Sequence, residues 1–273
     1  MRILSWDDAV SGGLSPHNQG RAAAIGVFDG MHRGHAVLLE ELAKQAGCSS
    51  MVVTFRENPK KILRPDAFTG DIFTLDQKLE YCESFGVDNA VIIDFSRNFS
   101  TIPGELFVRE LIAKMRVQRI VVGWDFSCGH NLDTPSHEVV RLAKAGGADA
   151  IVVPPVVHDG EVVSSTKIRK AIREGNIQYA ERLLGHPYTL DIRNFGFSEH
   201  EQCLDTLSVP LARPLEGSFR AVLDTGRERH AAVCVFGKEK ITWHGTVLQE
   251  KPRFIELICR LGYTDGRIAK ELD

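Results

Sequence analysis

The amino-acid sequence predicts an α/β domain built on a parallel β-sheet, followed by a smaller, β-rich domain. Two observations predict this order. Through the first two-thirds of the chain, short apolar runs alternate with amphipathic segments of helical length, as in a parallel sheet covered by helices on both faces. After about residue 188, short alternating runs are separated by glycine-containing turns, which indicates antiparallel strands in a sandwich or small barrel. With Gly185-His186-Pro187 as the boundary, the domains are residues 1–187 and 188–273.

The elements of the first domain follow from the spacing of its apolar residues. Strands are expected at 22–27, 51–55, 90–95, 119–123 and 150–153. Helices are expected at 35–46, 74–86, 104–115 and 137–145. Thr74, with a glutamine three residues on, forms a capping-box pair, Pro103 suits the first turn of the third helix, and Ser136 can cap the fourth.

The second domain is expected to begin with strands and to end with helices. Alternating runs predict strands within 188–197, 218–226, 230–237 and 240–248. The segments 253–263 and 265–272 have the pattern of helices.

Composition excludes several classes of protein. The 273-residue chain has a net charge of −3 and therefore no basic excess for binding a nucleic acid. No run approaches the roughly 18 apolar residues of a membrane span, and an Asp pair stands where a signal peptide would need its apolar core. The six cysteines show no C-x-x-C and no metal-ligand spacing, which is typical of reduced, buried thiols. We expect a cytoplasmic protein that has neither nucleic acid nor membrane as a partner.

A pair of histidines stands where the first long strand leads into a helix, in "AAIGVFDGMHRGHAVLLEEL" (23–42). Zinc would need further ligands for His32 and His35, and no Cys or carboxylate lies at supporting spacing. Both could be ordinary capping or surface histidines. A phosphate explains more of the stretch, because a helix N-terminus offers unpaired N–H groups and the positive end of a dipole. Imidazoles can donate to phosphoryl oxygens, and glycines let a ligand approach the backbone; these glycines are Gly26, Gly30 and Gly34.

Three other unusual segments also follow expected strands. They are "TFRENP" (54–59), "GWDFSCG" (123–129) and "VSSTKIR" (163–169). Parallel sheets bind ligands beyond the carboxyl ends of their strands, so the four segments predict one shared site.

These four segments resemble the motifs of one enzyme family. G-x-F-D-G-x-H-x-G-H resembles the signature of the H-x-G-H nucleotidylyltransferase superfamily, and most closely that of the bacterial FAD synthetases (FMN adenylyltransferases). "VVTFRENP" is similar to that family's T-F-x-P-H-P, "VVGWDFSCG" to its V-G-x-D-F-x-F-G, and "VSSTKIRKAI" to its S-S-T-x-I-R. The resemblance covers about residues 15–187.

The resemblance implies a Rossmann-like nucleotidylyltransferase domain that transfers AMP from ATP to FMN, giving FAD and pyrophosphate. His32 and His35 would contact the triphosphate and stabilise the transition state at the α-phosphorus. Ser165, Thr166 and Arg169 would bind phosphate oxygens from a second helix N-terminus. Mg²⁺ would accompany ATP, with no protein side chain assigned as its ligand.

The resemblance also assigns binding residues around these catalytic ones. Residues expected to bind the nucleotide are Gly26, Phe28, Asp29, Gly34, Gly123, Asp125, Phe126, Ser164 and Lys167. Residues expected on the flavin side are Phe55, Asn58 and Asp125. Plainer roles are open for several of them: Ser164 as part of a helix N-cap, Phe55 as core packing and Asp29 as a cap of the turn.

The chain departs from the family at three places. Glu57-Asn58 replaces the Pro-His of P-H-P, and "CGHNLDTP" replaces a glycine-rich, basic segment. Residues 188–273 lack the P-T-A-N motif of a riboflavin kinase barrel. We therefore expect an FMN adenylyltransferase with a degenerate kinase-like module. Two alternatives remain: a nucleotidylyltransferase for another phosphorylated small molecule, and a non-catalytic flavin or nucleotide binder.

Overall fold

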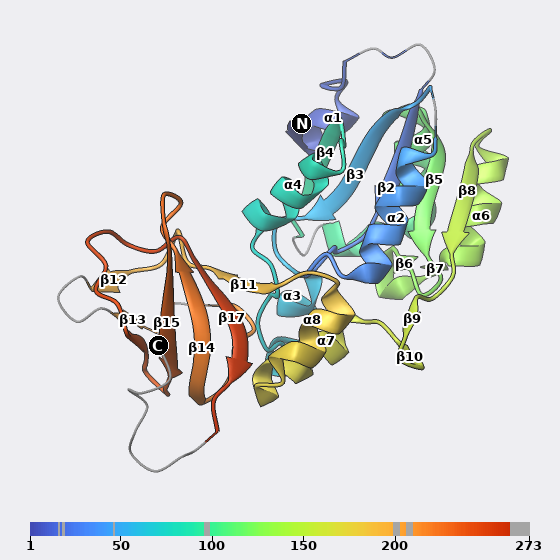
Figure 1. Ribbon diagram of the computed structural model, residues 1–273. Coiled ribbons are helices and arrows are strands. Elements are labelled where there is room, and N and C mark those ends of the chain that lie inside the picture. Colours follow the sequence, from blue (N-terminus) through green and yellow to red (C-terminus); the bar gives the residue numbers. More distant parts are fainter. Residues whose placement is uncertain are drawn as a thin grey trace. The chain divides into compact units, whose positions relative to one another are not determined.

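The computed structural model describes residues 1–15, 17, 20–45, 47–95, 99–198, 203–205 and 210–262. They form two compact units (Figure 1). The first comprises Met1–Phe68 and Leu75–Val162, and the second comprises Thr69–Thr74 and Val163–Asp273. Within the described residues, no helix is long and apolar enough to cross a membrane.

The first unit contains a six-stranded parallel sheet in the order β1-β4-β3-β2-β5-β8. The strands are β1 (Arg2–Ser5), β2 (Arg21–Ile25), β3 (Ser49–Phe55), β4 (Asn89–Ile93), β5 (Val117–Gly123) and β8 (Asp149–Val153). The chain moves outward from β2 through β3 to β4 and then returns to place β5 on the other side of β2. The switch point of the topology therefore lies between β2 and β5, where such sheets bind ligands.

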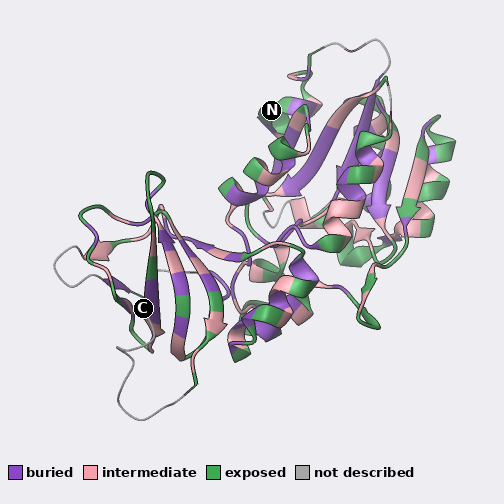
Figure 2. Cartoon of the chain, viewed as in Figure 1, coloured by how far each residue is buried: buried purple, intermediate pink, exposed green. Residues whose placement is uncertain are grey.

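Helices cover both faces of this sheet. They are α1 (Trp6–Val10), α2 (Arg33–Ala43), α4 (Leu75–Ser84), α5 (Gly104–Ala113) and α6 (Ser136–Ala145), while α3 (Pro59–Leu63) follows β3 and buries none of its residues. Alternate residues of the strands join α1, α5 and α6 in one apolar core. The α2 helix packs against β2 and β5 with its own buried leucines, outside that core. The central strands are thus buried along most of their length (Figure 2).

Short elements complete the first unit. Two-residue strands form the hairpins β6 (Ser127–Cys128) with β7 (Thr134–Pro135), and β9 (Val157–His158) with β10 (Glu161–Val162). Short 3-10 helices cover Pro65–Ala67, Phe99–Thr101 and His130–Leu132.

The second unit joins two helices to a curled antiparallel sheet. The helices are α7 (Ser165–Glu174) and α8 (Ile177–Leu184). The sheet order is β11-β17-β14-β15-β16-β13-β12, with antiparallel pairing throughout. Its strands are β11 (Tyr188–Asp191), β12 (Phe197–Ser198), β13 (Cys203–Asp205), β14 (Gly217–Asp224), β15 (Arg229–Phe236), β16 (Lys240–His244) and β17 (Phe254–Arg260). The predicted fold class, an α/β domain on a parallel sheet followed by a β-rich one, is confirmed.

Most predicted elements are present, with some differences. The segment 253–263, expected as a helix, contains β17, which pairs with β11 and β14. Buried Ile255 and Leu257 alternate with the less buried Phe254, Glu256 and Ile258, as on one face of a sheet. A short apolar run alone does not distinguish a strand from a helix. Ser136 is the first residue of α6 rather than its cap, and its hydroxyl donates to the carbonyl of Trp124 at 3.0 Å. The strand β1 was not expected.

Two expectations about the second domain stay predictions. The helix expected at 265–272 lies outside the described residues. The predicted boundary at 187–188 stays a prediction, and α7 and α8 belong to the same compact unit as the antiparallel sheet.

The segment Thr69–Thr74 lies between α3 and α4 in sequence but belongs to the second unit. Its Asp71 forms a β-bridge with Leu211, with backbone hydrogen bonds to Pro210 and Ala212. Gly70 has a φ of 100°, and a Cβ there would lie 2.5 Å from the Ala212 nitrogen. Only glycine therefore fits this position.

A buried ion pair holds the end of the same segment. The Thr74 hydroxyl donates to the Asp191 carboxylate at 2.7 Å, and Arg193 donates to it through Nε at 2.9 Å and Nη2 at 2.7 Å. Burial by itself would raise the pKa of Asp191, but the donors from Arg193 and Thr74 outweigh it and hold that pKa below its usual value. Asp191 is therefore ionised in the folded protein.

Replacing Asp191 by Asn removes the charge that pairs with Arg193. We expect a loss of about 2–4 kcal/mol in the free energy of unfolding at pH 7, measured by urea denaturation, because a partly buried guanidinium loses its partner. Since the pKa of Asp191 is lowered, the difference from the wild-type protein should shrink as the pH falls below about 4 and the carboxyl takes up its proton.

The matched control is Asp149→Asn, which removes the partner of Arg119 in an exposed ion pair. Its expected effect is below about 1 kcal/mol. Equal losses in the two variants would contradict a structural role for the Asp191 pair.

Candidate functional site

The turn between β2 and α2 has an unusual backbone. Phe28 and Met31 have φ values of 52° and 41°, and Gly30 has a φ of 82°. Left-handed conformation is costly for residues other than glycine and persists where the surroundings impose it. Here both non-glycine side chains are fully buried, so packing of the turn into the domain holds the backbone in place.

This turn brings the two predicted histidines face to face. His32 is the N-cap of α2, and its Nδ1 accepts a hydrogen bond from the His35 backbone N–H at 3.4 Å. The two imidazole rings stack with centroids 3.7 Å apart and planes 16° apart, and the Phe28 ring meets His35 edge-on at 5.3 Å. Two imidazolium ions at that separation would repel strongly. The stacked pair therefore carries at most one positive charge near neutral pH.

His35 is the neutral member of the pair. Burial lowers its pKa well below the usual value, and the nearby His32 and Lys78 lower it further. Its Nδ1 is buried and has no hydrogen-bond partner among the described residues. A neutral imidazole with such an atom is suited to hydrogen-bond a ligand without changing its charge.

Lys78 is the residue of this site that sequence reasoning missed. It lies on α4 with only 4% of its surface exposed, and its ammonium group donates to the carbonyls of Val27 at 3.3 Å and Phe55 at 3.1 Å. Nothing in the local sequence marks it, because a lysine in an amphipathic helix is normally exposed. Only the structure shows that α4 brings Lys78 to the carboxyl ends of β2 and β3.

The segment after β3 is arranged by capping and by packing. Asn58 is buried and caps α3, its Oδ1 accepting from the Lys60 N–H at 3.1 Å. Phe55 packs against the core of the unit and edge-on against Phe95. The Glu57 carboxylate, which replaces part of the family's P-H-P, forms an ion pair with Lys61 at 2.6 Å. The added negative charge is thus balanced on the surface of α3.

The segment after β5 makes a tight turn. The Phe126 N–H donates to the Gly123 carbonyl at 3.1 Å, and Phe126 packs against the core. A Cβ on Gly123 would lie 3.3 Å from an Asp125 carboxylate oxygen. Asp125 itself is exposed, which leaves its carboxylate accessible from solvent.

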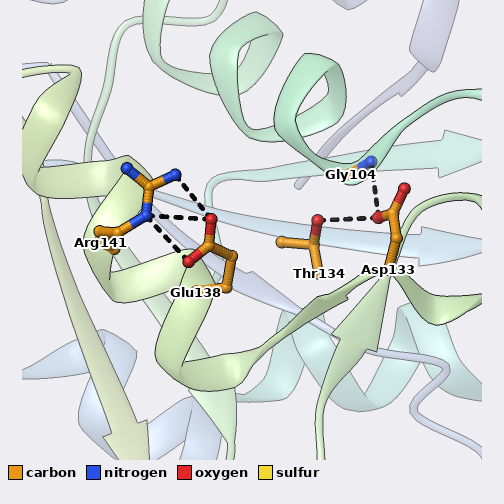
Figure 3. A network of polar contacts seen from close by, with 5 residues as sticks. All are labelled: Gly104, Asp133, Thr134, Glu138 and Arg141. Atoms are coloured by element: carbon orange, nitrogen blue, oxygen red, sulfur yellow. Dashed lines mark hydrogen bonds and ion pairs between the residues drawn. The ribbon is translucent and has the colours of Figure 1, made fainter.

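The altered loop that follows is closed by its own hydrogen bonds (Figure 3). Asp133 accepts from the Gly104 N–H at 3.1 Å, at the N-terminus of α5, and from the Thr134 hydroxyl at 2.8 Å. His130 Nδ1 lies 3.1 Å from the Ser100 carbonyl oxygen. Further along, Glu138 and Arg141 pair on α6. Burial, with a further contribution from Asp133, raises the pKa of the Cys128 thiol to about 12, so this thiol is not a nucleophile.

The S-S-T-x-I-R residues belong to the second unit. Ser164 is the N-cap of α7, with its hydroxyl accepting from the Lys167 N–H at 3.4 Å, and Ser165 and Thr166 form the first turn. Arg169 is buried, and its Nε donates to the Gly70 carbonyl at 2.9 Å. The capping role of Ser164 is confirmed, and Arg169 is held by the segment that enters this unit from between α3 and α4.

In the first unit, three neighbouring strands present the predicted site residues at their carboxyl ends. The order β3-β2-β5 puts the segments after these strands side by side. The residues concerned are Gly26, Phe28, Asp29, His32, Gly34, His35, Phe55, Asn58, Gly123, Asp125 and Phe126. The described residues contain no group of three or more His, Cys, Asp or Glu side chains placed to hold a metal ion.

A parallel sheet whose switch point carries a glycine-containing turn and a stacked H-x-G-H pair defines an α/β nucleotidyltransferase domain. A family model described as FAD synthetase matches residues 14–167. The chain belongs to the FAD synthetase family, as its motifs predicted.

Curated relatives agree with this assignment. The bifunctional riboflavin kinase/FMN adenylyltransferase of Escherichia coli (strain K12) is 31% identical, over 80% of this chain and 73% of the relative. The protein of the same name from Pseudomonas fluorescens is 32% identical, over 82% of this chain and 75% of the relative.

One solved structure has the same fold along nearly the whole chain. The macrolide-efflux protein of Streptococcus pneumoniae superposes with a TM-score of 0.78 at 22% identity. The match covers 97% of this chain and 94% of that one. This likeness concerns the fold alone.

Gly34→Ala tests the fit of the histidine pair. A Cβ on Gly34 would lie 3.1–3.2 Å from the His32 ring, close enough to displace a ring already stacked on His35. We expect kcat for the enzyme reaction to fall about tenfold or more. The melting temperature should stay equal or rise, since alanine favours a helix over glycine.

Gly146→Ala is not a suitable control, because its Cβ would also meet neighbours. Gly196→Ala is suitable, because nothing lies within 4 Å of a Cβ there. Unchanged kcat in Gly34→Ala would show that the ring positions are not critical.

Proposed function

We propose that the histidine turn of this chain is the catalytic centre of an ATP:FMN adenylyltransferase. The enzyme transfers the AMP moiety of ATP to FMN, and FAD and pyrophosphate are the products. Membership of the FAD synthetase family supports this reaction, and the matched residues 14–167 include the first three motifs and the Ser164–Lys167 part of the fourth. The observation that carries the proposal is the stacked His32–His35 pair at the N-terminus of α2.

The chemistry needs positioning and charge stabilisation more than proton transfer. The phosphate of FMN is already an anion at neutral pH, so it can attack the α-phosphorus of ATP without a strong general base. Charge grows on the bridging oxygen as pyrophosphate leaves, and donors fixed in place stabilise it. His32 and His35 supply imidazole nitrogens for this role.

The different environments of the two histidines suggest different contributions. His35, with its lowered pKa, donates or accepts a hydrogen bond as a neutral ring. His32 caps α2 through Nδ1, which accepts a backbone hydrogen bond, so the proton of the neutral ring is on Nε2.

Mg²⁺ fits this site as a companion of ATP. Asp29 is the one buried carboxyl residue of this turn, and the described residues include no group of three or more potential metal ligands, so the triphosphate oxygens would supply most ligands of the ion. When bound, Mg²⁺ neutralises charge on the phosphates.

Other residues are proposed to bind the substrates. Asp29, Gly123 and Phe126 follow β2 and β5 and are assigned to the nucleotide. Ser164, Ser165, Thr166, Lys167 and Arg169 supply hydroxyl, backbone and cationic donors for phosphate oxygens. Phe55, Asn58 and Asp125 are assigned to the flavin.

We propose that the chain has no riboflavin kinase activity. No Pro-Thr-Ala-Asn sequence occurs anywhere in the 273 residues. A chain without it depends on another protein for FMN. We also place the protein in the cytoplasm, because all six cysteines are free thiols.

The first test is product analysis by chromatography with ATP and Mg²⁺. FMN as acceptor should give FAD and pyrophosphate in equal amounts, and riboflavin should give neither FMN nor FAD. Nicotinamide mononucleotide and phosphopantetheine test other acceptors. Failure to form FAD from FMN, with turnover of another acceptor, would overturn the assignment of the substrate.

The His35→Ala variant tests whether the protein is an enzyme or only binds its ligands. Loss of one fixed donor to the transition state should lower kcat about 10²–10³-fold, while flavin fluorescence still reports FMN binding. His244→Ala, at an exposed position in the second unit, is the matched control and should retain full activity. Equal turnover in His35→Ala and the wild-type protein would remove His35 from the mechanism.

A further inference from the structure

Lys78 lies where a lysine is costly to keep. Its side chain is 4% exposed, and a buried ammonium group loses much of its hydration. Two of its hydrogen bonds go to the carbonyls of Val27 and Phe55. Both carbonyls stand at the carboxyl ends of neighbouring strands, Val27 two residues after β2 and Phe55 at the last residue of β3.

The Val27 carbonyl receives a second donor from β3. The Thr54 hydroxyl donates to it at 3.2 Å, and Thr54 is buried. The Val27 carbonyl is thus fixed from both α4 and β3, directly before Phe28 enters the left-handed region. The Phe28 ring in turn packs edge-on against His35, so the orientation of this peptide bears on the catalytic ring.

The charge of Lys78 acts on the same ring. Among the described residues, the charged groups that lower the pKa of His35 are His32, on its own turn, and Lys78, from α4. Asp29 is the buried carboxyl residue of the same turn. A nearby cation disfavours protonation of an imidazole, so Lys78 favours the neutral form of His35.

We propose that Lys78 is a positioning residue for adenylyl transfer, which acts by fixing the carbonyls of Val27 and Phe55 at the strand ends beside the histidine turn. This inference rests on the proposed function of the site. A purely structural lysine would alter stability alone. A positioning lysine alters kcat and the titration of His35 together.

The first variant is Lys78→Met, which keeps the length of the side chain and removes its charge and donors. We expect kcat for FAD formation to fall about 10–100-fold, with KM for ATP and FMN changed far less. The pKa of His35, followed by NMR of its imidazole, should rise because a repelling cation is gone. Activity should therefore begin to fall at a higher pH on the acid side than in the wild-type enzyme.

A second variant separates geometry from charge. Thr54→Val removes the other donor to the Val27 carbonyl without changing any charge, and valine suits a buried strand. We expect a smaller fall in kcat, roughly threefold to tenfold, as for one lost hydrogen bond, with no change in the titration of His35. Lys114→Met, an exposed lysine at the end of α5, is the control and should match the wild-type enzyme in both measurements.

Two outcomes would overturn the proposal. One is a Lys78→Met protein with wild-type kcat and unchanged titration of His35. The other, decisive if Lys78→Met does not fold, is a folded Thr54→Val protein with wild-type kcat. If the wild-type protein forms no FAD, the proposed function fails instead, and the His35 titrations of the variants still report whether Lys78 controls that ring.

Discussion

The left-handed backbone between β2 and α2 is the constraint on which the site depends. Holding Phe28 and Met31 in this conformation costs on the order of 1–3 kcal/mol each. Their fully buried side chains and the two donors to the Val27 carbonyl offset that cost. The turn then delivers His32 and His35 as a stacked pair at the start of a helix, at the switch point of the sheet.

The departures from the family's motifs leave this centre intact. Glu57 is paired with Lys61 on the surface of α3, so it does not add an unbalanced negative charge. Asp133 serves as an acceptor at the N-terminus of α5, within a loop that satisfies its own polar groups. Both changes therefore alter the surroundings of the strand ends, while the stacked histidine pair and the buried Lys78 remain in place.

Sequence patterns predicted the parallel sheet well because buried β-branched runs and capped helices carry strong local signals. The same patterns gave the wrong structure for β17. The alternation around Ile255 is too short to distinguish a strand from a helix, and the strands that pair with it, β11 and β14, are known only from the structure. Motif spacing located the histidines and the segments after β3 and β5. It could not find Lys78, because burial of a lysine is decided by how α4 packs and not by its neighbours in sequence.

The path of the chain has a consequence for how this protein can be divided. The backbone passes between the two units three times, after Phe68, after Thr74 and after Val162. A single cut at Val162 would leave Thr69–Thr74 without the strand-like partner at Leu211, and would leave Arg169 without the Gly70 carbonyl. Each unit consists of two separate stretches of the sequence, so recombination at a single point could not exchange either unit as a whole. The antiparallel sheet, in a chain that contains no Pro-Thr-Ala-Asn sequence, is thus tied to the first unit by the path of the polypeptide itself.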